Sequence, residues 1–178
     1  WGRSPDGHEI LHNRISLTVF DDIVTTPTTS TTPTPDHASY IKATSSIAED
    51  WLNDRYNTLW DLESSPNNPC PVGWKVPTKD ELAADTTLAT KTDVTNRATA
   101  LDSFLKLPTA GRISSSGVYG LHPEDGVGSN GRYWTSTVGT GADADDAVVL
   151  NFYGADPGTA VLTAHERAFG YSVRCIKE

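Results

Sequence analysis

The fold of this chain depends most on residues 68–78, which read Asn68-Pro69-Cys70-Pro71-Val72-Gly73-Trp74-Lys75-Val76-Pro77-Thr78. This stretch holds one of the two cysteines, and the other, Cys175, lies 105 residues later beside Gly170-Tyr171-Ser172-Val173-Arg174. Each cysteine adjoins a segment with a clear structural signal, so one long-range Cys70–Cys175 disulfide explains both positions. Two unrelated buried thiols are the alternative. A crosslink of this length stabilises a fold by about 4 to 5 kcal/mol and indicates an oxidising compartment.

Composition narrows the choice of partners. The chain has 178 residues, is predicted to form a single domain over residues 1–178, and carries a net charge of -9. Such an acidic chain repels phosphate backbones and anionic lipid surfaces, so we expect no nucleic acid partner. No apolar run approaches the ~20 residues that span a bilayer, so we expect no membrane insertion within this chain. It begins at Trp1 and contains no methionine, which predicts a processed piece of a longer precursor with an incomplete N-terminus.

Two helices are expected after the first cysteine. Thr78 and Glu81 have the spacing of a capping box, which predicts a helix from Lys79 to about Ala89. A second amphipathic helix, ended by Pro108, is predicted from apolar residues with helical spacing: Val94, Ala98, Leu101, Phe104 and Leu105. A weaker capping signal predicts a short helix that begins at Ser46.

Strands and loops are expected elsewhere. Alternating or β-branched runs predict strands at residues 15–24, 111–114, 133–138, 147–153, 160–164 and 171–177, separated by glycine-rich loops at 115–131, 139–146 and 154–159. The threonine and proline tract at 25–35 predicts an extended surface loop, either plain or carrying O-linked sugar. Together these elements predict an α+β domain. The expected core consists of Trp51, Trp60, Trp74, Leu82, Leu101, Phe104, Trp134, Leu150, Phe152 and Val173.

Five blocks of sequence carry a family resemblance. They are Trp1-Gly2-Arg3 with Asp6-Gly7-His8-Glu9, the stretch 68–78, Leu105-Lys106-Leu107-Pro108-Thr109-Ala110-Gly111, Gly131-Arg132-Tyr133-Trp134-Thr135-Ser136-Thr137, and Gly170-Tyr171-Ser172-Val173-Arg174-Cys175. In this order, over nearly the whole chain, they resemble the Fibrobacter succinogenes major paralogous domain family. That family is similar to the C-type lectin-like fold and is related to the formylglycine-generating-enzyme group. The resemblance implies two helices flanking small antiparallel sheets, paired terminal strands, and one exposed face built from the second-half loops.

The same resemblance implies an exported bacterial protein, extracellular or on the cell surface, in some cases anchored as a lipoprotein through an upstream segment. It implies no defined activity, and the residues agree with that expectation. The chain has no Cys-x-x-Cys pair, no Gly-x-Ser-x-Gly turn, and five scattered histidines. We therefore expect no enzyme and no cofactor.

An acidic loop raises the question of calcium. Asp143, Asp145 and Asp146 lie in a loop bounded by glycine, and carboxylate oxygens on neighbouring loop residues are the ligands that Ca²⁺ prefers. The segment lacks the spacing of an EF-hand, and a solvated acidic loop is the alternative interpretation.

Ligand recognition is expected on the second-half loops. Tyr119, His122, Asn130 and Tyr153 supply aromatic faces and hydrogen-bonding groups of the kind that hold sugars or protein surfaces. Trp134 is instead expected in the core, and Arg167 and Arg174 are expected to be structural. The sequence thus predicts a binding module for a protein or glycan at the cell surface, acting in adhesion or recognition. A self-assembling subunit of an extracellular fibre, filament or surface layer is the alternative.

Overall fold

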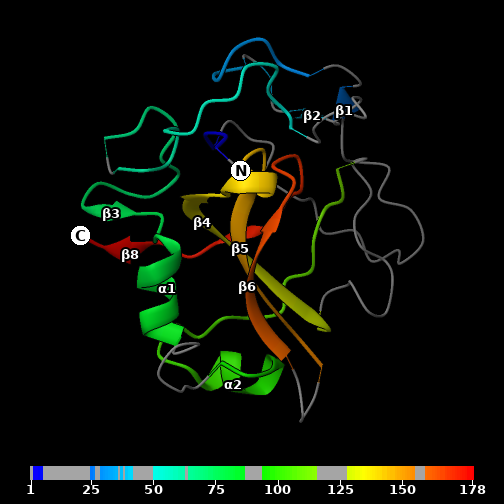
Figure 1. Ribbon diagram of the computed structural model, residues 1–178. Helices are drawn as coiled ribbons and strands as arrows, with labels where there is room; N and C mark the ends of the chain where they lie inside the picture. Colours follow the sequence, from blue (N-terminus) through cyan, green and yellow to red (C-terminus); the bar gives the residue numbers. More distant parts are fainter. Residues whose placement is uncertain are drawn as a thin grey trace.

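The computed structural model describes residues 2–5, 25–26, 29–35, 37, 39–41, 50–62, 64–86, 94–115, 128–154 and 159–178. The domain is mixed α+β, with two short helices beside small sheets (Figure 1). The strand predicted at 15–24 and the helix start predicted at Ser46 lie outside the described residues. No helix in the described ranges has the length and apolar character needed to cross a membrane.

The largest sheet has four strands in the order β6-β5-β4-β7. Strands β4 (Asn130–Val138), β5 (Ala147–Tyr153) and β6 (Thr159–His165) form an antiparallel meander, and β7 (Ser172–Val173) pairs parallel with β4. The strands predicted in this region are confirmed, with β4 beginning three residues earlier than expected.

The predicted strands at 111–114 and 171–177 are shorter than expected. Within 111–114 only Ile113 forms a β-bridge, to Gly170. The segment 171–177 is divided into β7 and β8 (Ile176–Lys177), because the two ends pair with different sheets.

The C-terminus is fixed to the stretch that contains the first cysteine. β8 pairs antiparallel with β3 (Trp74–Lys75), with Trp74 opposite Lys177. Cys70 and Cys175 form a disulfide, as the sequence predicted. The resemblance implied pairing between the two terminal strands, whereas in the described part of the chain the partner of β8 is β3.

The first helix, α1 (Lys79–Thr86), begins where the capping box predicted. The Glu81 amide donates to the Thr78 hydroxyl at 3.2 Å, and the Thr78 amide donates back to the Glu81 carboxylate at 2.8 Å. Burial alone would raise the pKa of Glu81, but hydrogen bonds from Lys75 and Thr78 more than offset it and lower that pKa. These contacts join β3 to the start of α1.

The second helix, α2 (Arg97–Asp102), is shorter than predicted, and its predicted apolar face is wrong. Asn96 caps its start and Ser103, with an extended backbone, ends it, so only six residues are helical and the helical period does not extend to Val94 or Leu105. Leu101 is exposed and Phe104 is 86% exposed, whereas Ala100, Leu105 and Leu107 are buried.

The core consists of two clusters, which involve opposite faces of the four-stranded sheet. One cluster includes Trp51, Trp60, Trp134 and Val149, and the other includes Leu82, Tyr133, Leu150 and Phe152. Six predicted core residues are confirmed as buried: Trp51, Trp60, Leu82, Trp134, Leu150 and Phe152. Trp74, Leu101 and Phe104 are exposed instead, and Val173 is partly buried against the first cluster.

The threonine and proline tract is held by the rest of the chain. β1 (Thr25–Thr26) pairs parallel with β2 (Tyr40–Ile41), and Ser30 exchanges backbone hydrogen bonds of 2.8 Å with Trp51 and Asn53. The sequence had suggested a plain loop because proline prevents a central strand. The short β1 strand contains no proline, so it can pair without losing a backbone donor.

Candidate functional site

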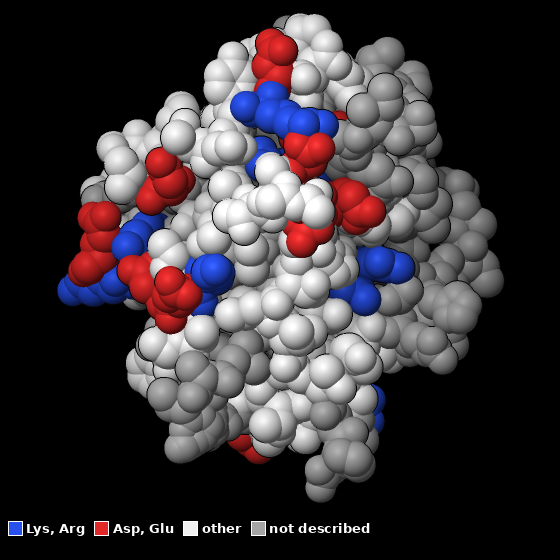
Figure 2. Space-filling model, viewed as in Figure 1, with Lys and Arg blue, Asp and Glu red and all other residues white. Residues whose placement is uncertain are grey.

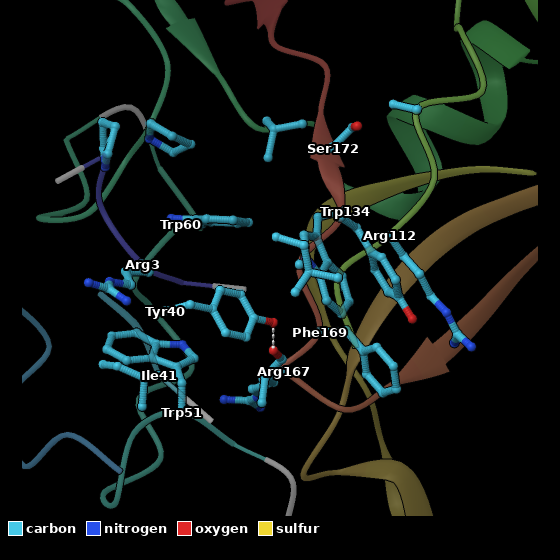
Figure 3. A pocket seen from close by; sticks show the side chains of 18 of the residues that line it. Arg3, Tyr40, Ile41, Trp51, Trp60, Arg112, Trp134, Arg167, Phe169 and Ser172 are labelled. Atoms are coloured by element: carbon cyan, nitrogen blue, oxygen red, sulfur yellow. Dashed lines mark hydrogen bonds between the residues drawn. The ribbon is translucent and has the colours of Figure 1, made fainter. Parts of the chain in front are cut away.

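A pocket of about 390 Å³ lies between two parts of the chain that are distant in sequence (Figure 3). One wall comes from the first 70 residues, and the other comes from residues 110–113, Trp134 and the segment 167–173. The aromatic residues that line it are Tyr40, Trp51, Trp60, Trp134, Phe169 and Tyr171. Their convergence gives the pocket a largely aromatic lining.

The polar ends of the first wall are bound within the protein. The Tyr40 hydroxyl donates to the Ala168 carbonyl, the contact drawn as a dashed line in Figure 3. The Trp60 indole N–H donates to the Asn67 carbonyl at 2.8 Å. Burial raises the pKa of Tyr40, so this hydroxyl stays protonated and remains a donor. These two side chains line the pocket with rings that are almost fully buried, Tyr40 at 6% and Trp60 at 5% exposed, while their polar atoms bind the protein itself.

Arg3 holds the N-terminal segment against this wall. Its guanidinium donates to the carbonyls of His37 at 2.7 Å and Ser39 at 2.8 Å. The same group lies 6.0 Å from the ring centre of Trp51, within the range of a cation–π contact. Arg3 is thus built into the wall and orients the segment that precedes β2.

Arg167 occupies the base of the pocket and is only 1% exposed. It donates to the Asn57 side-chain oxygen at 2.7 Å and to the carbonyls of Tyr56 and Asp146 at 3.3 Å. Burial raises the pKa of Asp50, and Arg167, 4.0 Å away, opposes that rise. The structural role predicted for Arg167 is confirmed, although it donates mainly to carbonyl oxygens rather than to carboxylates. Arg174, for which the same role was predicted, is exposed.

The second wall is a stack of rings. Tyr171 lies 4.6 Å from Trp134, Phe169 stacks on Tyr171 at 5.5 Å, and the Arg112 guanidinium lies 5.3 Å from the Phe169 ring. In Figure 3 the Arg112 side chain extends away from Tyr40 and Trp60 on the opposite wall. The stack fixes the orientation of the segment that follows β6.

A histidine supports this stack. The His165 Nδ1 atom lies 2.7 Å from the Tyr171 hydroxyl. Burial, followed by the positive charges of Arg132 and Arg112, lowers the pKa of His165 to about 4, and burial raises the pKa of Tyr171. Neither group changes its protonation near neutral pH, so the pair does not suit acid–base catalysis.

The charge on the pocket wall differs from that of the whole protein. Among the residues that the structure describes, its charged lining residues are three arginines, Arg3, Arg112 and Arg167, without an aspartate or a glutamate. The whole chain has 23 acidic and 14 basic residues, so its overall composition would favour acidic over basic residues on the pocket wall. Acidic and basic side chains are interspersed over other parts of the surface in Figure 2. Asp50, 4.0 Å from Arg167, offsets part of this charge, so the excess of basic groups on the wall comes mainly from Arg3 and Arg112.

The two predicted ligand residues that the structure describes, Asn130 and Tyr153, do not line this pocket. Asn130 was expected to be exposed, but it begins β4 and is only 6% exposed. Tyr153 is 43% exposed at the far end of β5 and does not line the pocket. Tyr119 and His122 lie outside the described residues.

Sequence reasoning missed the first wall, which is built around Tyr40, Trp51 and Trp60. The signal available was the Trp1-Gly2-Arg3 block, one of those that carry the resemblance, whose arginine contacts that wall. The second wall contains the Gly170-Tyr171 block, but nothing in the local sequence pattern indicates that the two blocks meet.

The acidic loop has other contacts. It contains a short 3-10 helix, η1 (Gly141–Asp143), and Asp145 pairs with Arg55 across the surface. Burial, with the nearby Glu166 and Asp143, raises the pKa of Asp146. Among the residues that the structure describes, no group of three or more histidine, cysteine or acidic side chains is placed to hold a metal ion. The structure thus lends no support to calcium at Asp143, Asp145 and Asp146.

Comparisons of this chain with known proteins identify no relative. No family model matches the chain, and neither a curated protein nor a solved structure matches it.

Proposed function

We propose that this chain is a non-catalytic recognition domain that takes an aromatic or aliphatic group of an acidic partner protein into the pocket. The observation that carries the proposal is the convergence of rings from both halves of the chain on one cavity, with their polar ends bound elsewhere. A concave apolar site with a few polar groups is the usual form of a ligand site.

The wall favours a protein side chain over a sugar. A sugar ring stacks on an aromatic face, but its hydroxyls also need several convergent donors and acceptors. Here the Tyr40, Trp60 and Tyr171 polar atoms already have partners inside the protein. An apolar anchor loses little by leaving water, whereas a sugar hydroxyl without a partner costs about 1 to 3 kcal/mol.

The charge of the pocket wall indicates which residues of the partner should lie next to that apolar anchor. The described lining residues include three arginines and no acidic residue, although the Asp50 carboxylate lies close to Arg167; this excess of basic groups favours a carboxylate next to the anchor. Because Arg3 and Arg167 are bound within the protein, their contribution is a positive potential more than a direct contact. An aspartate, a glutamate or a terminal carboxylate beside an aromatic residue satisfies this requirement.

The family resemblance extends the proposal to fold and location. We infer a C-type lectin-like domain of the Fibrobacter succinogenes major paralogous domain family, at the bacterial cell surface. The α+β arrangement and the disulfide that fixes the C-terminal strand beside the first helix support this inference. A disulfide also fits an oxidising compartment.

An NMR titration of the intact ¹⁵N-labelled domain tests the function. The probes are indole-3-acetate, indole and methyl glucoside. We expect indole-3-acetate to shift the indole signals of Trp51 and Trp60, and to bind about 3 to 10 times more tightly than indole at low salt, a gain of roughly 1 kcal/mol. Methyl glucoside should leave the spectrum unchanged.

Two variants show where the probe binds. Ala110 is exposed and lines the pocket, so Ala110→Trp should block the site and abolish the shifts. Ala84 is exposed on α1 and does not line the pocket, so Ala84→Trp should bind as the parent does. Binding of methyl glucoside without binding of indole-3-acetate would contradict the proposal, as would undiminished binding to Ala110→Trp.

A further inference from the structure

Strand β6 is an open edge of the main sheet. It forms seven consecutive residue pairs with β5, from Thr159 opposite Tyr153 to His165 opposite Ala147, and the register has no bulge. Among the described residues no strand pairs with its other side. A regular seven-residue edge presents a row of backbone donors and acceptors to any further strand.

Proteins that stay monomeric usually protect such an edge with charges, proline, a bulge or a very short strand. β6 reads Thr-Ala-Val-Leu-Thr-Ala-His, with no acidic residue, lysine, arginine or proline. Its one titratable side chain, His165, is hydrogen bonded to Tyr171. Val161 is 40% exposed, and Figure 2 shows a broad uncharged surface in the region where β6 runs in Figure 1. In the part of the chain that the structure describes, the edge therefore lacks the usual protection.

We propose that β6 pairs antiparallel with β6 of a second copy of this chain, so that the two four-stranded sheets form one sheet of eight strands. The two-fold axis passes through Leu162. This interface is separate from the pocket, because no β6 residue lines that cavity.

The sequence of β6 is complementary to itself in this register. It is the only antiparallel register that pairs all seven residues, and it places Ala160 opposite Ala164 and Val161 opposite Thr163. Small residues thus meet small ones, and two β-branched residues, which favour strands, meet each other. No residue pair in this register brings like charges together, so nothing opposes pairing with a second copy. Because β6 has no acidic residue, lysine or arginine, it also has no charge pattern that would select a different, oppositely charged strand.

The register also keeps each face of the sheet continuous. Ala160 and Leu162 pack against the second core cluster, whereas Val161 and Thr163 lie on the other face because side chains alternate along a strand. In the paired arrangement even-numbered residues lie opposite even-numbered ones. The face that packs on the second core cluster therefore continues into the same face of the second copy, and the opposite face does likewise. A shift by one residue would put core-side residues opposite outer ones.

The strength of this contact should depend on salt. A single strand pair buries less than the about 1,200 Å² of a standard interface, so the dimer should be weak. Each copy carries a net charge of -9, and the two charges repel. Raising the salt concentration screens this repulsion and should increase the dimer fraction.

Sedimentation equilibrium of the intact chain tests the proposal. We expect a monomer–dimer equilibrium that salt shifts toward the dimer. Val161→Lys places a charge on the open edge and should yield a monomer. Val72 is 95% exposed and lies outside β6, so Val72→Lys is the matched control and should dimerise like the parent. A parent chain that is still monomeric at about 1 mM in high salt, where even a Kd of roughly 100 μM would give mostly dimer, overturns the proposal. A dimer that Val161→Lys leaves intact also overturns it.

A crosslinking experiment tests the register. Val161→Cys and Thr163→Cys are prepared separately, mixed and oxidised. Because residue 161 of one copy lies opposite residue 163 of the other, the mixture should form a mixed disulfide dimer much faster than Val161→Cys alone. Equal rates would contradict the register through Leu162.

Discussion

Removing the disulfide is the perturbation whose effect follows most directly from the structure. Cys70 and Cys175 are 105 residues apart, and the double variant Cys70→Ala, Cys175→Ala opens that loop in the unfolded chain. The chain-entropy relation gives a loss of about 4.7 kcal/mol for a loop of this length. With about 2 to 4 °C for each kcal/mol in a chain of this size, Tm should fall by about 10 to 19 °C.

The noncovalent contacts around the disulfide offer little compensation. β3 and β8 form only two residue pairs, Trp74 with Lys177 and Lys75 with Ile176, and Trp74 is exposed. Without the crosslink, this pair of strands should open locally before the main sheet does. Local opening of this kind is visible as lost amide protection.

Urea denaturation measures the loss of stability, and hydrogen exchange locates it. We expect the amides of β3 and β8 to lose protection while those of β4 and β5 keep most of theirs. Val72→Ala, a change at an exposed residue near the crosslink, is the control and should alter the free energy of unfolding by less than about 0.5 kcal/mol. A loss below about 1 kcal/mol in the double variant, or unchanged protection in β8, would refute the reasoning.

Two further predictions concern buried charge and pH. Arg167→Ala should lower the free energy of unfolding by about 3 to 5 kcal/mol, because it leaves Asp50 buried without its nearby positive charge. Arg174 is exposed, so the control Arg174→Ala should change that free energy by less than about 0.5 kcal/mol. Urea denaturation measures both variants, and equal effects would contradict the structural role of Arg167. The folded pKa of His165 is about 4 and the ordinary value is 6.5, so the unfolded chain binds more protons between them. The free energy of unfolding should therefore fall as the pH drops through that window, by on the order of 2 kcal/mol. His165→Gln should flatten this part of the pH profile, and an unchanged profile would contradict a buried neutral histidine.

Local signals predicted local structure well. The capping box at Thr78 and Glu81 correctly placed the start of α1, and the apolar run at 147–153 correctly gave both ends of β5. The two cysteines predicted the disulfide because there was no other cysteine to pair with. Each of these predictions depends on a few neighbouring residues or on a unique pairing.

Other features could not be predicted because tertiary packing overrides local pattern. The apolar spacing of Leu101 and Phe104 suggested a buried helix face, but the Asn96 cap starts a helix of only six residues. Asn130 belonged to a glycine-rich stretch, yet β4 begins there and buries it.

The pocket was beyond sequence reasoning for the same reason. Its walls include residues more than a hundred positions apart, such as Tyr40 and Ala168, and no local sequence pattern indicates the hydrogen bond that joins these two. What the sequence did contain was a surplus of tryptophan and tyrosine and blocks at both ends of the chain. Neither indicates which rings meet.

Intermolecular NOEs between indole-3-acetate and the intact domain test the central claim most directly. If the pocket binds an aromatic group between its two walls, the indole protons should show NOEs to Trp60 on one wall and to Val173 on the other. NOEs to residues of one wall alone, or to surface residues such as Phe104, would contradict a binding pocket formed by the two halves of the chain.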